Sequence, residues 1–165
     1  MPRIEAREID AAAFAPFGLL IDANRRIPES INAGTTQRHS DLASLDLRAP
    51  DRDPVVGIYV AQARRFPLRL EKLERHAEAS QVFLPLGPHR FMVVVAPGGE
   101  APDWRLLAAF VTFPWQGVSL HRGCWHHGLV ALRDADRFAV LEGGNYRHDT
   151  EEVAAPEEWL LGAWP

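Results

Sequence analysis

Short apolar stretches separated by turn-forming residues recur along this chain and limit the folds that it can adopt. Most are four to six residues long and rich in Val, Ile, Leu and Phe, which favours β-strands over helices. Gly, Pro, Asn and Asp residues lie between them. The stretches that we interpret as strands are residues 17–21, 55–60, 68–71, 81–84, 91–96, 117–121, 128–132 and 138–141. About seven to nine short strands with little helix predict a mainly β fold, either a sandwich or a barrel.

Helical patterns are short. Asp10 precedes an Ala-rich segment, which predicts an N-capped helix over residues 11–14. Asp103 predicts a second short helix over residues 104–110. Residues 22–53 are polar and irregular, and a loop of that length is usually functional or contacts another subunit. The tail after Asp149 is acidic and then rich in Trp and Leu, so we expect it to pack on the body.

The composition narrows the function classes. At 165 residues we expect one domain spanning residues 1–165, and 47% hydrophobic with 24% charged residues is typical of a soluble globular protein. Lys and Arg number 18 against 22 Asp and Glu, with no dense basic run, so nucleic acid is not an expected partner. No apolar run is long enough to cross a membrane. A lone cysteine, Cys124, and an N-terminus without a signal peptide pattern predict a cytoplasmic protein.

Three of the seven histidines fall within seven residues. Alternation along a strand places His121, Trp125 and His127 on one face and His126 on the other, unless Gly123 bends the strand and resets the alternation. Imidazole is the commonest metal ligand and titrates near neutral pH, so the cluster indicates a functional site. The alternative is a set of structural histidines bonded to backbone carbonyls.

A second group of candidate ligands lies upstream. Glu74 and His76 are two positions apart and would share one face of a strand, and Gln81 follows after a short turn-like segment. With His121 they supply two imidazoles, a carboxylate and an amide, which suit a divalent ion of intermediate hardness. The alternative is a surface strand with ordinary charges.

These two groups resemble the two motifs of the cupin family. Glu74-x-His76-x4-Gln81 is similar to the first motif, His-x-His-x4-Glu, with Glu and Gln in the outer positions. Gln116-Gly117-x3-His121 is similar to the second, with a spacer one residue longer. The resemblance implies a cupin-type double-stranded β-helix, or jelly roll, with its site inside the barrel. Because Gln is a weak neutral ligand, the identity of the divalent ion and the need for it stay open.

A closer resemblance is to the ureidoglycolate lyase family, and it runs from about residue 14 to residue 144. The segments that carry it are Ile31-Asn32-x-Gly34, Asp41-Leu42, residues 73–76, Gln81-x-Phe83-x-Pro85, residues 93–96, Pro102-Asp103, Ala109-Phe110, and residues 116–118 through 125–127. The resemblance implies a homodimer that cleaves ureidoglycolate to glyoxylate and urea in allantoin degradation, a part of purine and nitrogen metabolism.

The chemistry of this reaction indicates roles for particular residues. The expected metal ligands are Glu74, His76, Gln81 and His121. If no metal binds, the expected base is Glu74 or His121, and the parity of the strand makes His127 the expected acid for the departing urea. The expected substrate-binding residues are Arg38 as a carboxylate clamp, with Arg90 and Arg122 as further candidates, together with Gln116 and Trp125.

Two other functions remain open at this point. An amidohydrolase acting on ureidoglycolate would release ammonia and carbon dioxide instead of urea. A cupin that binds a small carboxylate without catalysis would release no product.

Overall fold

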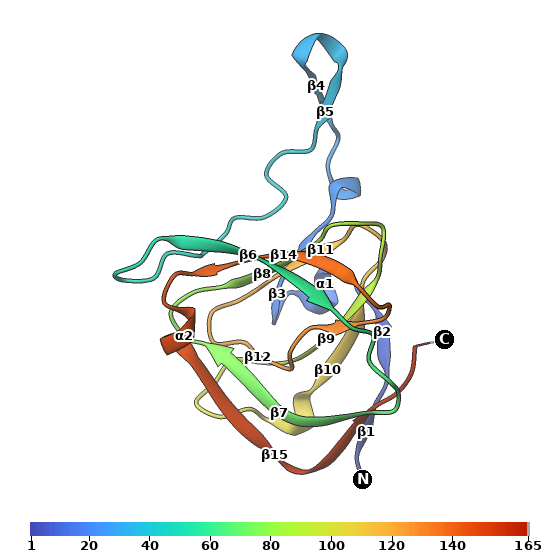
Figure 1. The fold of residues 1–165 in the computed structure, drawn as a ribbon, viewed down its shortest axis with the longest axis vertical. Coiled ribbons are helices and arrows are strands. Elements are labelled where there is room, and N and C mark those ends of the chain that lie inside the picture. Colours follow the sequence, from blue (N-terminus) through green and yellow to red (C-terminus); the bar gives the residue numbers. More distant parts are fainter. Residues whose placement is uncertain (165) are drawn as a thin grey trace.

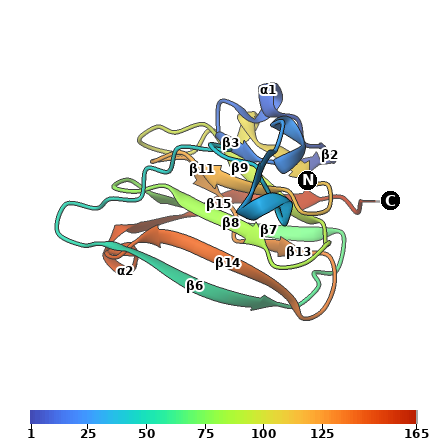
Figure 2. The same cartoon turned by 90° about the horizontal axis from the view of Figure 1, so that it is seen from above.

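Two β-sheets pack face to face in the computed structural model, which describes residues 1–164 (Figures 1 and 2). The larger sheet contains, in spatial order, β1 (Arg3–Ile4), β15 (Thr150–Leu161), β7 (Leu68–His76), β12 (Trp125–His126), β9 (Phe91–Ala96), β10 (Ala108–Val111) and β2 (Ala6–Glu8), with β13 (Val130–Ala131) also on β9. The smaller sheet contains β3 (Gly18–Ile21), β11 (Gly117–Leu120), β8 (Gln81–Pro85), β14 (Asp136–Gly143) and β6 (Pro54–Ala61). The predicted mainly β jelly roll is confirmed.

The core between the sheets follows the two-residue period of the strands. On β9, Phe91, Val93 and Val95 face the smaller sheet, where they meet residues such as Phe83 and Phe138. The alternate β9 residues face outward into a second apolar cluster with Leu161 and Trp125. All six β9 residues are buried, because β9 carries apolar packing on both faces.

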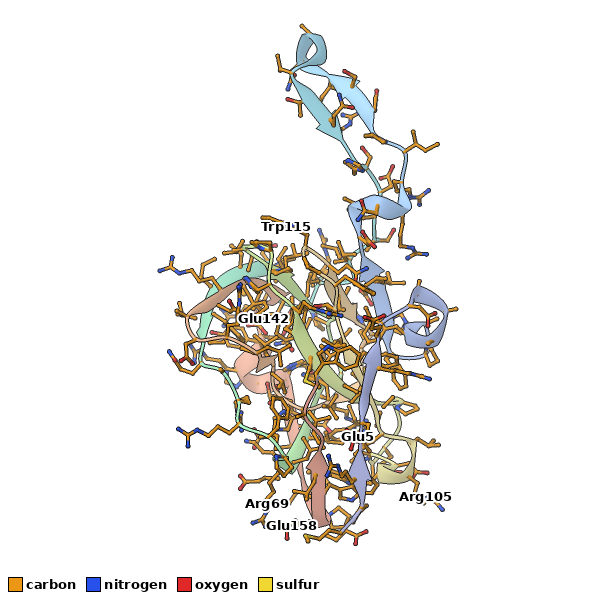
Figure 3. All side chains as sticks on the ribbon, turned by 90° about the vertical axis from the view of Figure 1, so that its right-hand side faces the viewer. Glu5, Arg69, Arg105, Trp115, Glu142 and Glu158 are labelled. Carbon is orange, nitrogen blue, oxygen red and sulfur yellow. The ribbon has the colours of Figure 1, made fainter. Side chains whose placement is uncertain are left out.

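A hairpin projects from the barrel as an arm, which comprises β4 (Glu29–Ile31), β5 (Thr36–Arg38) and the 3-10 turn η2 (Asn32–Gly34) (Figures 1 and 3). Another 3-10 turn, η1 (Ala23–Arg25), lies at its base. Nearly every arm side chain is partly or fully exposed. Residues 22–53, which the sequence predicted to be polar and irregular, thus contain an arm with few contacts to its own barrel.

The short helix α1 (Ala11–Phe14) is confirmed, and Asp10 Oδ1 accepts a hydrogen bond from the Ala13 amide at 2.9 Å. The helix predicted over residues 104–110 is wrong. Only the 3-10 turn η3 (Trp104–Leu106) forms behind the Asp103 cap, and the chain then enters β10. Pairing with β9 and β2 and full burial of Phe110 outweigh the helical pattern.

The C-terminal tail packs on the body as predicted, and it does so as a strand. After α2 (Tyr146–Asp149), β15 runs antiparallel to β7 within the larger sheet, and its Leu161 joins the outward-facing apolar cluster. The sequence did not predict β1, β2 or β15 as strands. No helix among the residues described has the length and hydropathy needed to cross a membrane.

Candidate metal and substrate site

Glu74, His76 and His126 meet on the inner face of the larger sheet. The register places His126 of β12 opposite Glu74 of β7 and also opposite Val95 of β9, whose side chain is part of the core between the sheets. His76 lies two residues beyond Glu74 and so shares its face. One ligand atom from each of the three side chains lies within 4.8 Å of the other two.

His126 presents an acceptor nitrogen to Glu74. Its Nδ1 lies 3.0 Å from the Cys124 carbonyl oxygen, and because a carbonyl only accepts, Nδ1 carries the proton of the neutral ring. Nε2 then carries a lone pair, lies 3.3 Å from Glu74 Oε1, and has no hydrogen-bond partner among the residues described. Two acceptors at this separation require a positive charge, either a second proton on His126 or a metal ion. A protonated His126 would hydrogen-bond to the Glu74 carboxylate, and this interaction holds the pKa of Glu74 below its usual value.

His76, like His126, has its proton on Nδ1 and an acceptor at Nε2. The Thr150 hydroxyl donates to the Tyr146 carbonyl at 2.7 Å, so its oxygen can accept from His76 Nδ1 at 3.3 Å. The Nε2 of neutral His76 is therefore also an acceptor, and it is buried without a partner in the part of the chain described. Burial lowers the pKa of His76 and favours this neutral form.

The smaller sheet contributes polar groups from the opposite wall. Gln81 of β8 donates through Nε2 to Glu142 Oε2 of β14 at 2.9 Å, and within residues 1–164 its own Oε1 has no donor. The Gln81 side chain is close enough to His76 to oppose the lowering of the histidine pKa by burial. Burial raises the pKa of Tyr59 on β6 to about 12, and the charges of Glu142 and Glu74 add to this effect. Polar groups of both sheets therefore face a common interior (Figure 3 labels Glu142).

A cavity of about 400 Å³ opens beside the cluster. It is lined by Arg64, Leu68, Arg69, Glu71, Lys72, Glu74, His126, His127 and Gly128. His127 Nδ1 lies 2.8 Å from the Gly128 carbonyl oxygen, so in the neutral ring Nε2 is the free acceptor. Burial lowers the pKa of His127 and keeps the ring neutral near pH 7.

The structure brings Glu74, His76, Gln81 and His127 together but does not bring His121 to them. The chain leaves β11 at Leu120 and turns at Gly123, whose φ is +71°, so the alternation is reset as the sequence allowed. His121 is exposed in this turn, with Nε2 3.1 Å from the Ala15 carbonyl oxygen. His126 lies where the sequence analysis expected His121. Counting the alternation from Gly123 was the signal that could have identified it.

The predicted substrate-binding residues lie outside the cavity. Arg122 forms an ion pair with Asp46 at 2.5 Å, and Arg38 forms one with Glu29 within the arm. Arg90 contacts Glu8 and the Thr112 carbonyl. Gln116 donates to Asp22 at the base of the arm. Trp125 faces outward, with its indole donating to Gly99 and Arg75 lying over its ring.

Comparison with known proteins identifies relatives along nearly the whole chain. The family model described as ureidoglycolate lyase matches residues 1–162. The ureidoglycolate lyase of Burkholderia mallei (strain NCTC 10229) is 39% identical over 161 residues, which cover 97% of this chain and 94% of that protein. The ureidoglycolate lyase of Azotobacter vinelandii (strain DJ / ATCC BAA-1303) is 42% identical over 155 residues, which cover 93% of each chain.

Proposed function

We propose that this chain, which belongs to the ureidoglycolate lyase family, cleaves ureidoglycolate to glyoxylate and urea. The family membership expected from the sequence is confirmed, and its relatives are lyases. The observation that supports the activity at this site is the convergence of unpartnered acceptors from His76, His126 and Gln81 on the Glu74 carboxylate, beside a cavity lined by His127.

The reaction moves one proton from oxygen to nitrogen. The central carbon of ureidoglycolate carries a hydroxyl, a carboxylate and a urea nitrogen. As the C–N bond breaks, its electron pair goes to nitrogen, and the C–O bond becomes the carbonyl of glyoxylate. The hydroxyl must lose a proton and the departing nitrogen must gain one, so no net proton is consumed.

We assign this transfer to His127. Its neutral Nε2 accepts the hydroxyl proton and returns it to the urea nitrogen, while Nδ1 stays bonded to the Gly128 carbonyl. This role extends the acid role expected from the sequence, and a lowered pKa suits a group that must begin as a base. Without a metal ion, Glu74 would be the alternative base.

The residues present fit a divalent ion. Glu74, His76 and His126 would hold it, with the Gln81 amide oxygen as a weak fourth ligand, and such a nitrogen and oxygen set favours ions of intermediate hardness. When bound, the ion would polarise the hydroxyl and carboxylate oxygens of the substrate as a Lewis acid.

The test of the function is an assay of racemic ureidoglycolate that measures urea, glyoxylate and ammonia together, with and without a chelator. Equal amounts of urea and glyoxylate are expected, with loss of activity on chelation if the ion is required. Ammonia in place of urea would indicate the amidohydrolase, and binding without any product would indicate the non-catalytic cupin.

We also propose that the protein is a homodimer and that β6 forms part of its interface. Val56, Ile58 and Val60 lie on one outer face of this edge strand and are 68%, 56% and 55% exposed. The strand carries no charged residue, whereas exposed edge strands of monomers are usually protected by charges. The arm leaves the barrel after β3, at the opposite edge of the smaller sheet from β6, and projects away from the barrel in Figure 1, so it would also be available to a second copy.

The same proposal covers the setting of the reaction. We place residues 1–165 as one catalytic domain in the cytoplasm, acting in allantoin degradation. The single, buried, unpaired Cys124 supports a reducing compartment. Accumulation of ureidoglycolate in cells that lack the protein and are grown on allantoin would support the pathway, and unchanged levels would contradict it.

A further inference from the structure

We propose that Arg64 anchors the carboxylate of the substrate in the cavity beside Glu74, His126 and His127. This inference rests on the proposed function and names a residue that the sequence motifs did not indicate. It assigns to Arg64 the role that the sequence analysis expected of Arg38.

The backbone around Arg64 is fixed relative to the histidines. Arg64 lies in the connection between β6 and β7, and its amide donates to the Ala131 carbonyl of β13 at 3.0 Å. The neighbouring Ala63 amide donates to Asp134 Oδ1 at 2.9 Å. Strand β13 follows His127 in the chain after a few residues, so the same segment positions the histidine and holds the arginine backbone.

The guanidinium of Arg64 is free to bind an anion. Within residues 1–164 its side chain makes no hydrogen bond within the protein and no ion pair, whereas Lys72 on the same cavity is paired with Glu152 at 2.6 Å. Its side chain lines the same cavity as Glu74, His126 and His127. Arg69 also lines the cavity, but it lies on β7 opposite Leu160 of β15, at the lower end of the molecule in Figure 3.

The cavity carries charges of both signs. Glu71 and Glu74 line it together with Arg64, Arg69 and Lys72, so an anionic substrate needs a cation that is not already paired with a carboxylate, as Lys72 is with Glu152. A guanidinium offers two parallel N–H donors that match a carboxylate, and this bidentate pairing fixes orientation as well as charge. With the carboxylate held by Arg64, the adjacent hydroxyl-bearing carbon would lie toward His127 and the acceptor cluster. The anchor therefore selects 2-hydroxy carboxylates over their uncharged amides.

The experiment compares Arg64→Ala and Arg64→Lys with Arg65→Ala, a matched control because Arg65 is also exposed but does not line the cavity. The KM for ureidoglycolate should rise by about ten- to a hundredfold in Arg64→Ala, with a smaller change in kcat and partial rescue in Arg64→Lys. Arg65→Ala should stay within about twofold of the parent protein, the scatter expected of a surface change away from the site. A KM for Arg64→Ala close to that of the parent, or an equal loss in Arg65→Ala, would overturn the assignment.

A binding measurement separates this inference from the proposed function. Glycolate and glycolamide differ in the carboxylate alone, and NMR titration of the folded proteins gives the affinity for each without turnover. The parent and Arg65→Ala should prefer glycolate, and Arg64→Ala should lose that preference. If the parent releases no urea yet shows this pattern, the lyase proposal fails and the anchor stands; a preference that persists in Arg64→Ala overturns the anchor whatever the activity.

Discussion

The Nε2 atom of His126 lies 3.3 Å from Oε1 of Glu74, and the Nδ1 of the same ring lies 3.0 Å from the Cys124 carbonyl oxygen. The first contact depends on the pairing of β12 with β7, and the second fixes which nitrogen faces the carboxylate. Since both facing atoms are acceptors in the neutral ring, the strand register alone creates a place for a cation.

A divalent ion should therefore stabilise the protein through His126. Mn²⁺, Ni²⁺ or Zn²⁺ at a hundred times its dissociation constant should raise the unfolding free energy of chelator-treated protein by about 2.7 kcal/mol. His126→Ala should remove the increase in melting temperature. His121→Ala tests the ligand expected from the sequence motif and should keep the increase, because His121 bonds to Ala15 away from the cluster. Loss of the increase in His121→Ala, with retention in His126→Ala, would reverse the ligand assignment.

The free energy of unfolding should decrease as the pH falls from 7.5 to 5.5. Burial lowers the pKa of His76 below its ordinary value of 6.5, so below pH 6.5 the unfolded chain takes up this proton more readily than the folded one. The contribution is complete above pH 6.5 and is lost as the pH falls toward the folded-state pKa. Urea denaturation of metal-free protein at each pH would measure it.

The control for this pH effect is His76→Gln, which should show a smaller decrease. The comparison is needed because burial raises the pKa of Glu142, and that carboxyl contributes with the opposite sign. An equal decrease in both proteins would show that His76 does not carry the effect.

Local signals in the sequence were enough to predict most of the strands and the helix caps. Alternating or continuous apolar runs located β3, β8, β9, β11 and β14, because each buries at least one face in a core that local composition reveals. The apolar run of β6 also predicted a strand, although none of its residues is buried. The Asp10 and Asp103 caps were also correct. Residues 108–111 were not predictable in this way, since Ala-Ala-Phe-Val becomes a strand only through its partners β9 and β2.

The sequence predicted the kind of site, a cluster of metal-binding side chains, but not all of the residues that form it. Glu74, His76 and Gln81 follow from spacing within one part of the chain, but His126 depends on a turn at Gly123 with positive φ. Arg64 and Glu142 carry no local signal, because only the closing of the barrel brings their strands and loops toward β7. Long-range pairing decides these positions.

Cys124 should be unreactive in the folded protein. It is 2% exposed, and burial raises the pKa of its thiol from 9.0 to about 12, which leaves about a thousandfold less thiolate at neutral pH. Labelling with a thiol reagent such as DTNB should be slow in buffer and rapid in denaturant, and Cys124→Ala should keep its turnover. Rapid labelling of the native protein would contradict this burial.

Ile58→Lys should weaken the dimer. A lysine on the outer face of β6 would place a charge in the proposed apolar interface, which should shift sedimentation toward the monomer. Leu106→Lys is a matched control, because Leu106 is 54% exposed, close to the 56% of Ile58, but lies on η3. If neither change alters the mass in solution, β6 is not the interface.

His127→Ala should lower kcat by about a hundred- to ten-thousandfold, the usual range for loss of a positioned proton-transfer group. The folded state should survive, since the His127 ring lines the cavity and its side chain bonds to the adjacent Gly128 carbonyl alone. His148→Ala, which removes an exposed histidine on α2, is the control for general effects of histidine loss. Below the lowered pKa of His127 the parent activity should fall, because the protonated ring can no longer accept the hydroxyl proton, and this limb of the pH profile should be absent from the residual activity of His127→Ala. A folded His127→Ala variant with full turnover would exclude the relay and return the base role to Glu74.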